Sequence, residues 1–251
     1  MAYIAFFDSG LGGVTVMKEA RRLLPREDFV YFGDTANAPY GTRTEEDIRS
    51  LTCEAVKKLL PYGVKALVIA CNTATAAAAA TLRRELTIPV IGIEPALKPA
   101  HSLLKDGVIA VIATQATLSL QKFKDLMSLY GERACPIPGT GLVELIESNK
   151  SDSPECRALL RRLLAPCEKD GLDAIVLGCT HYVYLRRVLN EMYPGVPVVD
   201  GHNGTARRLA DVLRQNDLLE DAHGSTIFLS SGGEEAVSLM RSMYDRLDPD
   251  Q

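Results

Sequence analysis

The sequence has no tryptophan, and aromatic residues make up only 6% of its 251 positions. It therefore lacks the aromatic platform on which single-stranded nucleic acids usually stack. The formal net charge is −4 and the sequence pI is near 5.7, so the basic surface that accompanies nucleic-acid binding is missing as well. We expect no nucleic-acid partner.

Long hydrophobic runs are also lacking. No apolar stretch approaches the roughly 18 residues that are typical of a membrane span. The first apolar stretch has no basic residues before it and is interrupted by Asp8, Ser9 and Gly10, which is unlike a signal peptide. These absences predict no membrane partner and a cytoplasmic location.

The cysteines form no CxxC pair, which disfavours a zinc site and a thioredoxin-like redox site. In a protein that is not exported, thiols are more common than disulfides. We therefore expect no metal and no disulfide framework, and free thiols at all six cysteines: Cys53, Cys71, Cys135, Cys156, Cys167 and Cys179.

What the sequence does contain is a regular alternation of short apolar runs and helix-length segments. This alternation predicts βαβ units, and hence an α/β fold with mainly parallel sheets flanked by helices. Strands are expected at 2–7, 28–33, 65–70, 88–93, 107–113, 173–178, 196–200 and 225–230, with a weaker one at 133–137. Helices are expected at 14–24, 44–60, 73–86, 96–105, 117–130, 154–169, 181–192, 204–216 and 233–246.

An internal repeat indicates two similar domains. The run Ala66–Ala70 followed by Cys71 matches the run Ala174–Gly178 followed by Cys179. Pro95 and Pro99 indicate a crossing point between the two halves. We predict a discontinuous first domain, residues 1–94 plus 204–251, and a second domain, residues 95–203.

The two matched cysteines are the strongest candidates for chemistry. Each follows a predicted strand, and ligands of open α/β sheets bind at the carboxyl ends of the strands. The helix expected after each cysteine would favour the thiolate at its N-terminus. Either cysteine alone could be a buried structural residue, but the matched pair suggests two sulfurs that exchange a proton with opposite faces of one carbon.

Polar residues follow other predicted strands. The glycine-rich segment Asp8–Gly13 could present backbone N–H groups to an anion, or form a tight turn in which Ser9 caps a helix. It matches no nucleotide-binding motif. Thr114 and Thr117 are expected to be helix caps, and Asp34–Arg43 could be a simple turn before a helix.

The residues next to the cysteines could bind an amino group or a carboxylate, or merely cap their helices. They are Asn72, Thr73, Thr180 and His181. His181 could also exchange a proton near neutral pH. We assign no role to His101, His202 and His223, and we expect Glu144 and Glu147 to lie on the solvated face of a helix.

Taken together, these motifs resemble the glutamate racemases of the aspartate/glutamate racemase family over nearly the whole chain. The matching segments are Asp8-Ser9-Gly10 with Gly12-Gly13, Gly33-Asp34-Thr35 with Pro39-Tyr40-Gly41, Cys71-Asn72-Thr73-Ala74, and Gly178-Cys179-Thr180-His181. The resemblance implies two pseudo-twofold-related α/β domains with the active site in the cleft between them. It implies a cofactor-independent enzyme that interconverts L- and D-glutamate and supplies D-glutamate for peptidoglycan synthesis.

The resemblance also assigns roles to individual residues. Cys71 would deprotonate D-glutamate and Cys179 would deprotonate L-glutamate, with Asp8 and His181 as auxiliary catalytic groups. Substrate contacts would come from Asp8, Ser9, Tyr40, Gly41, Asn72, Thr73, Thr117, Thr180 and His181. A homodimer is compatible with this assignment, but the sequence does not determine the oligomeric state.

The chain departs from the family pattern at three places. The segment from Cys135 to Glu144 is one residue longer than usual, so a role for Glu144 as an auxiliary acid is in doubt. Val183-Tyr184 replaces the usual Pro-Leu, and Gly201-His202 stands where a serine often follows the aspartate.

Three other functions remain open from the sequence. The first is a racemase for another amino acid such as aspartate. The second is a two-lobed protein that binds a small anion without catalysis, which would make no use of two matched thiols. The third is a redox sensor, although thiols on opposite sides of a ligand need not approach disulfide distance.

Overall fold

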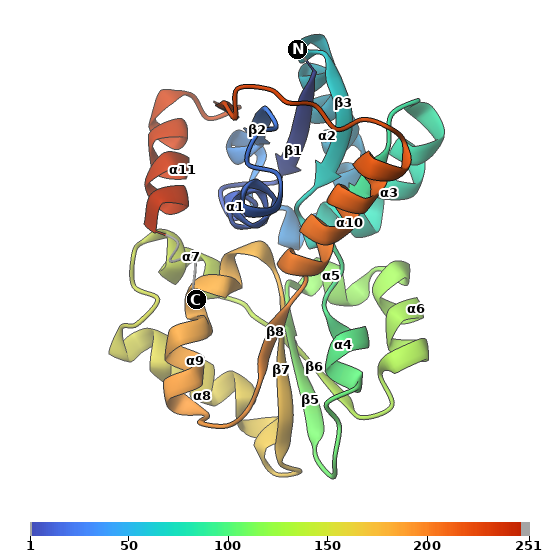
Figure 1. Ribbon diagram of the computed structural model, residues 1–251. Helices are drawn as coiled ribbons and strands as arrows, with labels where there is room; N and C mark the ends of the chain where they lie inside the picture. The colour runs from blue at the N-terminus through green and yellow to red at the C-terminus, as the bar shows by residue number, and fades with distance from the viewer. Residues whose placement is uncertain (1, 247–251) are drawn as a thin grey trace. The chain divides into compact units, whose positions relative to one another are not determined.

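Figure 1 shows a computed structural model of the chain, which describes residues 2–246. The strands are β1 (Tyr3–Asp8), β2 (Phe29–Gly33), β3 (Val64–Ile69), β4 (Val90–Gly92), β5 (Val108–Ala113), β6 (Ala134–Pro138), β7 (Leu172–Gly178), β8 (Val198–Asp200) and β9 (Thr226–Ser230). The α helices are α1 (Val14–Leu23), α2 (Glu45–Leu59), α3 (Asn72–Glu85), α4 (Leu97–His101), α5 (Gln115–Ser119), α6 (Gln121–Tyr130), α7 (Leu142–Glu147), α8 (Pro154–Glu168), α9 (Arg186–Met192), α10 (His202–Gln215) and α11 (Glu234–Arg246).

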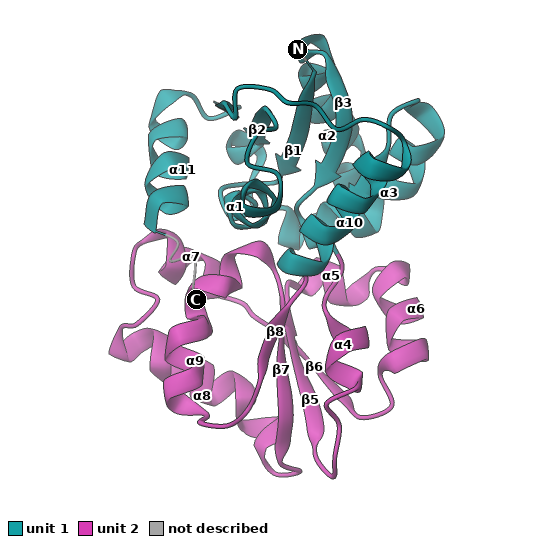
Figure 2. Cartoon of the chain, viewed as in Figure 1, with its two compact units in different colours: residues 1–93, 202–248 teal, residues 94–201, 249–251 magenta. Residues whose placement is uncertain are grey.

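The elements form two compact units, which Figure 2 distinguishes by colour. Unit 1 consists of the described residues up to Ile93 and those from His202 onward, and unit 2 is Glu94–Gly201. The sequence instead led us to place Glu94 in the first domain, and His202 and Asn203 in the second. Residues 1 and 247–251 of the predicted first domain lie outside the described residues.

Unit 1 contains a five-stranded sheet with the order β4-β3-β1-β2-β9, in which all pairs are parallel. Its central strand, β1, is apolar and fully buried from Ile4 to Phe7. Burial of consecutive residues is typical of a parallel strand whose two faces are both covered. Helix α1 packs against α10, and α2 packs against α3.

Unit 2 contains a four-stranded parallel sheet with the order β6-β5-β7-β8. Its core includes Ile109 and Val111 of β5 and Ala174 and Val176 of β7. All nine expected strands are present, including the weakly predicted β6. The predicted fold class, α/β with two mainly parallel sheets flanked by helices, is confirmed.

Three predicted helices differ from the observed ones. The helix expected at 96–105 is only the five-residue α4, which ends at His101. The segment expected as one helix at 117–130 is split into α5 and α6, because Leu120 adopts an extended backbone conformation. The helix expected at 181–192 begins as the 3-10 helix η4 (Thr180–Leu185) and becomes α-helical only in α9. Sequence periodicity does not separate a 3-10 turn from the first turn of an α helix.

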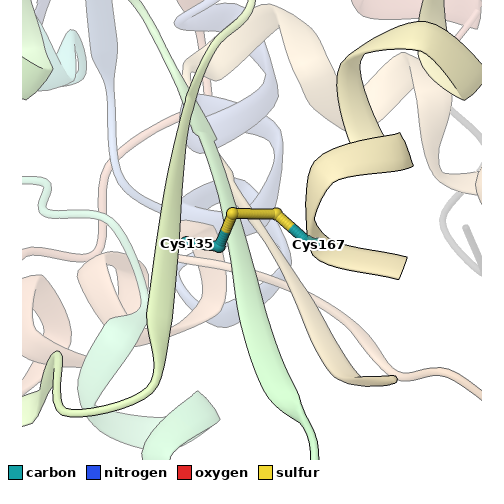
Figure 3. The surroundings of a disulfide bond; sticks show 2 residues. All are labelled: Cys135 and Cys167. Carbon is teal, nitrogen blue, oxygen red and sulfur yellow. A yellow bond between two sulfur atoms is a disulfide. The ribbon is translucent and has the colours of Figure 1, made fainter. Parts of the chain in front are cut away.

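The prediction that all six cysteines are free is wrong for two of them. Cys135 of β6 and Cys167 of α8 form a disulfide, with their Cα atoms 6.2 Å apart (Figure 3). A separation of 32 residues conceals this proximity in the sequence, because packing of α8 against β6 brings the two cysteines together. Cys53, Cys71, Cys156 and Cys179 are free.

The longest α helices, α2 and α8, have 15 residues each. Within residues 2–246, no helix combines the length and the apolar character that crossing a membrane requires.

Candidate active site

The strand order places one thiol beside the switch point of each sheet. In unit 1, β1 lies between β2 and β3: the connection that leaves β1 runs to β2 on one side, and the next connection, from β2, crosses back to β3 on the other side. In unit 2, β5 lies in the same way between β6 and β7. Ligands of open α/β sheets bind at such points, beyond the carboxyl ends of the strands. Cys71 follows β3 and Cys179 follows β7. The two matched segments of the sequence are therefore equivalent strands of the two sheets, each followed by a cysteine.

Cys71 is the N-cap residue of α3 and is 6% exposed. Its Sγ accepts a hydrogen bond from the backbone N–H of Ala74 at 3.4 Å, and it lies 3.3 Å from the hydroxyl of Ser9. Both contacts can stabilise a thiolate, as does the positive end of the helix dipole. Ser9 therefore belongs to the surroundings of the thiol, and the alternative in which it caps α1 is wrong, since Gly13 occupies the N-cap position.

Asp8 is the last residue of β1 and is buried, and its Oδ1 accepts a hydrogen bond from the backbone N–H of Gly10 at 2.8 Å. The neighbouring loop packs closely around it. A Cβ added at Gly13 would lie 2.6 Å from Cβ of Asp8 and 2.9 Å from Cβ of Ala70, which is closer than real Cβ contacts allow. The glycine is thus needed so that the loop can approach the strand ends beside Cys71.

Tyr40 is buried, and its hydroxyl donates a 2.6 Å hydrogen bond to Oδ2 of Asp34. Burial raises the pKa of Tyr40 well above its ordinary value, and the hydrogen bond to Asp34 raises it further, as do the nearby charges of Cys71 and Asp8. Tyr40 therefore stays a neutral hydrogen-bonding group. Gly41 follows it in the short 3-10 turn Tyr40–Thr42.

Asp34 was part of a motif in the sequence, but we assigned it no role of its own. It follows β2 directly and is buried, and it accepts hydrogen bonds from Tyr40 and from Nδ2 of Asn37. It therefore positions Tyr40 and orders the loop. Its place after a predicted strand was the signal that could have identified it.

Asn72 and Thr73 open helix α3 immediately after Cys71, and both are buried. Within the described part of the chain, Oδ1 of Asn72 is buried without a hydrogen-bond partner. A buried amide oxygen normally has a donor, because leaving it unpaired costs about 1 to 3 kcal/mol. A ligand that brings an N–H group, such as an ammonium group, would satisfy this oxygen.

In unit 2, Cys179 is 8% exposed and lies beside His181. The Sγ of Cys179 is 4.0 Å from Nδ1 of His181, and Nε2 of the same ring is 2.9 Å from Oε1 of Glu147. An ionised carboxylate can only accept, so Nε2 donates to it, and in the neutral ring Nδ1 is then the acceptor that faces the thiol. The imidazole is thus oriented to take up the thiol proton of Cys179.

The expectation that Glu144 and Glu147 both lie on a solvated face is wrong for Glu147. Helix α7 packs against η4 and so directs Glu147 onto the histidine, whereas Glu144, one turn earlier, is exposed. No local pattern in the sequence indicates this contact, because Glu147 and His181 are 34 positions apart.

Thr117 and Thr180 complete the predicted residues of unit 2, and both are buried. Thr114 is the N-cap of α5, as expected, and its hydroxyl accepts the backbone N–H of Thr117 and donates to the Thr117 hydroxyl at 2.9 Å. Thr117 therefore lies at the carboxyl end of β5, next to β7, whose end carries Cys179. The ends of β5 and β7 lie close together because residue 178 is a glycine: a Cβ at Gly178 would lie 2.8 Å from Cβ of Ala113.

Each unit thus carries one thiol together with several of the predicted residues, most of them at or just after the carboxyl ends of its strands. Unit 1 contributes Cys71, Asp8, Ser9, Tyr40, Gly41, Asn72 and Thr73, and unit 2 contributes Cys179, Thr117, Thr180 and His181. Among residues 2–246 there is no cluster of three or more His, Cys, Asp or Glu side chains suited to a metal ion.

Residues 12–209 match the family model described as Asp/Glu/Hydantoin racemase. The chain belongs to this racemase family. Among curated relatives, the glutamate racemase of Clostridium perfringens (strain SM101 / Type A) is 47% identical over 221 residues, which cover 86% of this chain and 85% of that protein. The glutamate racemase resemblance inferred from the motifs is confirmed, and with it the prediction of an enzyme of the racemase type.

Solved structures of racemases share the fold. The crystal structure of a glutamate racemase from Bacillus anthracis matches with a TM-score of 0.88 at 31% identity, covering 98% of this chain and 95% of that one. The glutamate racemase from Thermus thermophilus, crystallised with beta-chloro-D-alanine, matches with a TM-score of 0.84 at 38% identity, covering 98% and 94%.

Proposed function

We propose that this racemase interconverts L-glutamate and D-glutamate with no cofactor: one of Cys71 and Cys179 removes the Cα proton, and the other delivers its own proton to the opposite face. The observation that carries the proposal is the pair of buried, free thiols, each at a strand end beside the switch point of its sheet. Glutamate as substrate is supported by the relatives named above.

The reaction needs one thiolate and one thiol. The thiolate takes the proton from Cα, the electrons of the broken C–H bond remain on carbon, and the other thiol returns a proton to the opposite face. Product release leaves the two sulfurs with their protonation states exchanged. Both directions therefore use the same two groups, and each cysteine needs a neighbour that helps it gain or lose its proton.

The two thiols have different neighbours for this task. Beside Cys179, His181 is oriented by Glu147 and can accept the thiol proton through Nδ1. Beside Cys71, the hydroxyl of Ser9 and the N–H of Ala74 face the sulfur. We assign the auxiliary acid–base role on this side to Asp8, which is buried at the end of β1.

The substrate's charged groups need partners of matching chemistry. The buried Oδ1 of Asn72 fits the α-ammonium group as an acceptor. Thr73 and Thr180 are the proposed hydrogen-bond donors to the carboxylate, on which negative charge builds as Cα loses its proton. In other enzymes, loss of one such donor costs roughly 2.7 to 4 kcal/mol of transition-state stabilisation. Ser9, Tyr40, Gly41 and Thr117 are proposed as the remaining substrate contacts.

Hydrogen exchange at Cα tests the proposal directly. The purified enzyme is incubated with L-glutamate in deuterated solvent, without added cofactor and with a chelator present, and mass spectrometry follows deuterium at Cα. We expect deuterated D-glutamate to accumulate. Loss of exchange on chelation, restored by a metal ion, would contradict cofactor independence.

A parallel incubation with L-aspartate, followed by circular dichroism, distinguishes glutamate from the alternative substrate. Equal or faster turnover of aspartate would overturn the substrate assignment. A binding protein without catalysis would show exchange with neither amino acid, and a cysteine-to-serine change would leave its ligand binding intact.

The metabolic role and the cellular location of the enzyme stay predictions from the resemblance to the family and from the sequence. D-glutamate made by this enzyme would supply peptidoglycan synthesis in the cytoplasm. A homodimer and the absence of a nucleic-acid partner also stay predictions from the sequence.

A further inference from the structure

Unit 1 has a groove that is separate from its candidate active-site residues. Its volume is about 840 Å³, and it lies along β4, the edge strand of the sheet, between the C-terminal end of α3 and one face of α10. Lys65, near the start of β3, lines this groove, whereas Cys71 follows the other end of the same strand. At about 3.3 Å per residue, the two positions are roughly 20 Å apart along the chain direction.

The groove is lined by positive and amide side chains without carboxylates. Among the described lining residues, the charged ones are Lys65, Arg83 and Arg208, and no Asp or Glu is present. Lys65 is already neutralised, since its Nζ lies 2.6 Å from Glu27 and 3.7 Å from Glu220. Two carboxylates thus face the one ammonium group of Lys65, and the positive charge left among the described lining residues is that of Arg83 and Arg208, in a chain whose formal net charge is −4.

Arg83 is anchored in the groove. Its Nε donates a 3.1 Å hydrogen bond to the backbone carbonyl of Val90 in the edge strand. This bond fixes the guanidinium group while its two terminal nitrogens remain for another partner. Neither Arg83 nor Arg208 forms an ion pair with any residue between positions 2 and 246.

The other residues that line the groove indicate what the ligand should contain besides its anionic group. Apolar side chains form a smaller part of the surface than polar groups do, among them Leu86, Ile88, Pro89 and Val212, and the amide of Gln215 lies beside them. The volume falls within the range of small-molecule pockets, roughly 300 to 1,000 Å³, and is far larger than a single inorganic ion needs. Such a surface favours a ligand that combines an anionic group with an apolar body.

We propose that this groove binds a phosphate monoester with an apolar body, with Arg83 and Arg208 holding the phosphate. A phosphate monoester carries a charge of about −1.5 to −2 near pH 7, which matches two guanidinium groups. Arginine pairs with phosphate through two parallel hydrogen bonds, so an Arg83 already fixed at Nε loses little freedom on binding. The site is independent of the proposed racemase mechanism.

Phenyl phosphate is the probe, because it has the proposed charge and an apolar ring. Binding is measured by isothermal titration calorimetry on the full-length enzyme, in the presence of saturating D-glutamate so that the catalytic site is filled. We expect saturable binding of phenyl phosphate at least about tenfold tighter than that of inorganic phosphate. Arg208→Ala and Arg83→Ala should each weaken it about tenfold, as expected for loss of one charge-assisted contact.

Two neighbouring arginines provide matched controls. Arg84 and Arg207 are exposed, lie next to Arg83 and Arg208 in the sequence, and are not among the residues that line the groove. Arg84→Ala and Arg207→Ala should keep the affinity within about twofold. All four variants should retain racemase activity, and Arg208→Ala avoids the structural bond that Arg83→Ala removes.

Three results would overturn the proposal. The first is that phenyl phosphate shows no saturable binding, and the second is that it binds no more tightly than inorganic phosphate. The third is that all four variants lose the same amount of affinity for phenyl phosphate. The last would indicate general surface charge rather than a site.

Discussion

The Nε2 atom of His181 lies 2.9 Å from Oε1 of Glu147, while Nδ1 of the same ring lies 4.0 Å from the sulfur of Cys179. These three residues come from α7, the end of β7 and η4. The carboxylate fixes which ring nitrogen carries the hydrogen, and this decides whether the histidine can accept a proton from the thiol.

Replacing Glu147 with glutamine should therefore impair proton transfer at Cys179 more than it impairs folding. An amide can donate to Nε2 and so stabilise the wrong tautomer. We expect kcat to fall at least about tenfold, with a changed pH profile on the basic limb and an unchanged melting temperature. Glu144→Gln, in the exposed position one turn earlier, is the control. If both variants behave like the parent enzyme, Glu147 does not orient the histidine.

Single serine variants of the two cysteines should show opposite preferences for enantiomers. Racemisation should collapse in both, because each lacks one of the two required groups. An analogue that eliminates chloride after loss of its Cα proton needs only one base, and β-chloroalanine has this property. Following the family assignment, Cys71→Ser should still process the L-isomer, and Cys179→Ser the D-isomer. Pyruvate release, measured with a coupled dehydrogenase, reports the rates, and the same preference in both variants would refute the two-thiol mechanism.

The Cys135–Cys167 disulfide should stabilise the chain in its oxidised form. Closing a loop between residues 32 positions apart is expected to contribute about 3 to 4 kcal/mol through the entropy of the unfolded state. Cys167→Ser should lower the free energy of unfolding in urea by this order, and a reductant should have the same effect on the parent enzyme. Cys53→Ser serves as the control because Cys53 is free. Non-reducing peptide mapping should recover the linked peptides, and finding only free thiols there would contradict the bond.

Alkaline pH should destabilise the protein in part through Tyr40. Burial and the hydrogen bond to Asp34 raise the pKa of Tyr40 in the folded state, so the folded chain keeps a proton that the unfolded chain releases near pH 10. This contribution is fully present below pH 10 and is lost as the pH rises further. The free energy of unfolding should therefore fall above pH 10. In Tyr40→Phe that fall should be shallower by about 1.4 kcal/mol per pH unit.

The same variant should lose about 1 to 3 kcal/mol at neutral pH, because a buried carboxylate of Asp34 loses a donor. Urea denaturation at several pH values measures both effects. If the free energy of unfolding of Tyr40→Phe falls with pH above pH 10 as steeply as that of the parent enzyme, the protonation of Tyr40 does not contribute to this fall.

Local patterns in the sequence were sufficient for the strands, the fold class and the two thiols. Apolar runs such as Val64–Ile69 and Leu172–Gly178 bury consecutive residues, which is a property of the run itself and so is visible without the fold. The position of Cys71 and Cys179 after such runs placed them at strand ends, where binding groups gather. Asn72, Thr73, Thr180 and His181 were candidates because they follow the two thiols directly, whereas Tyr40 and Gly41 came only from the resemblance to the family.

Only the tertiary structure decided which distant residues meet. The bond between Cys135 and Cys167 and the contact between Glu147 and His181 join positions more than 30 residues apart. Both depend on the packing of one short helix or strand against another, which no local periodicity encodes. Asp34 became a partner of Tyr40 for the same reason, since a turn between them folds the hydroxyl back onto the carboxylate. Sequence patterns thus determined the kind of site, while packing determined which side chains orient its groups.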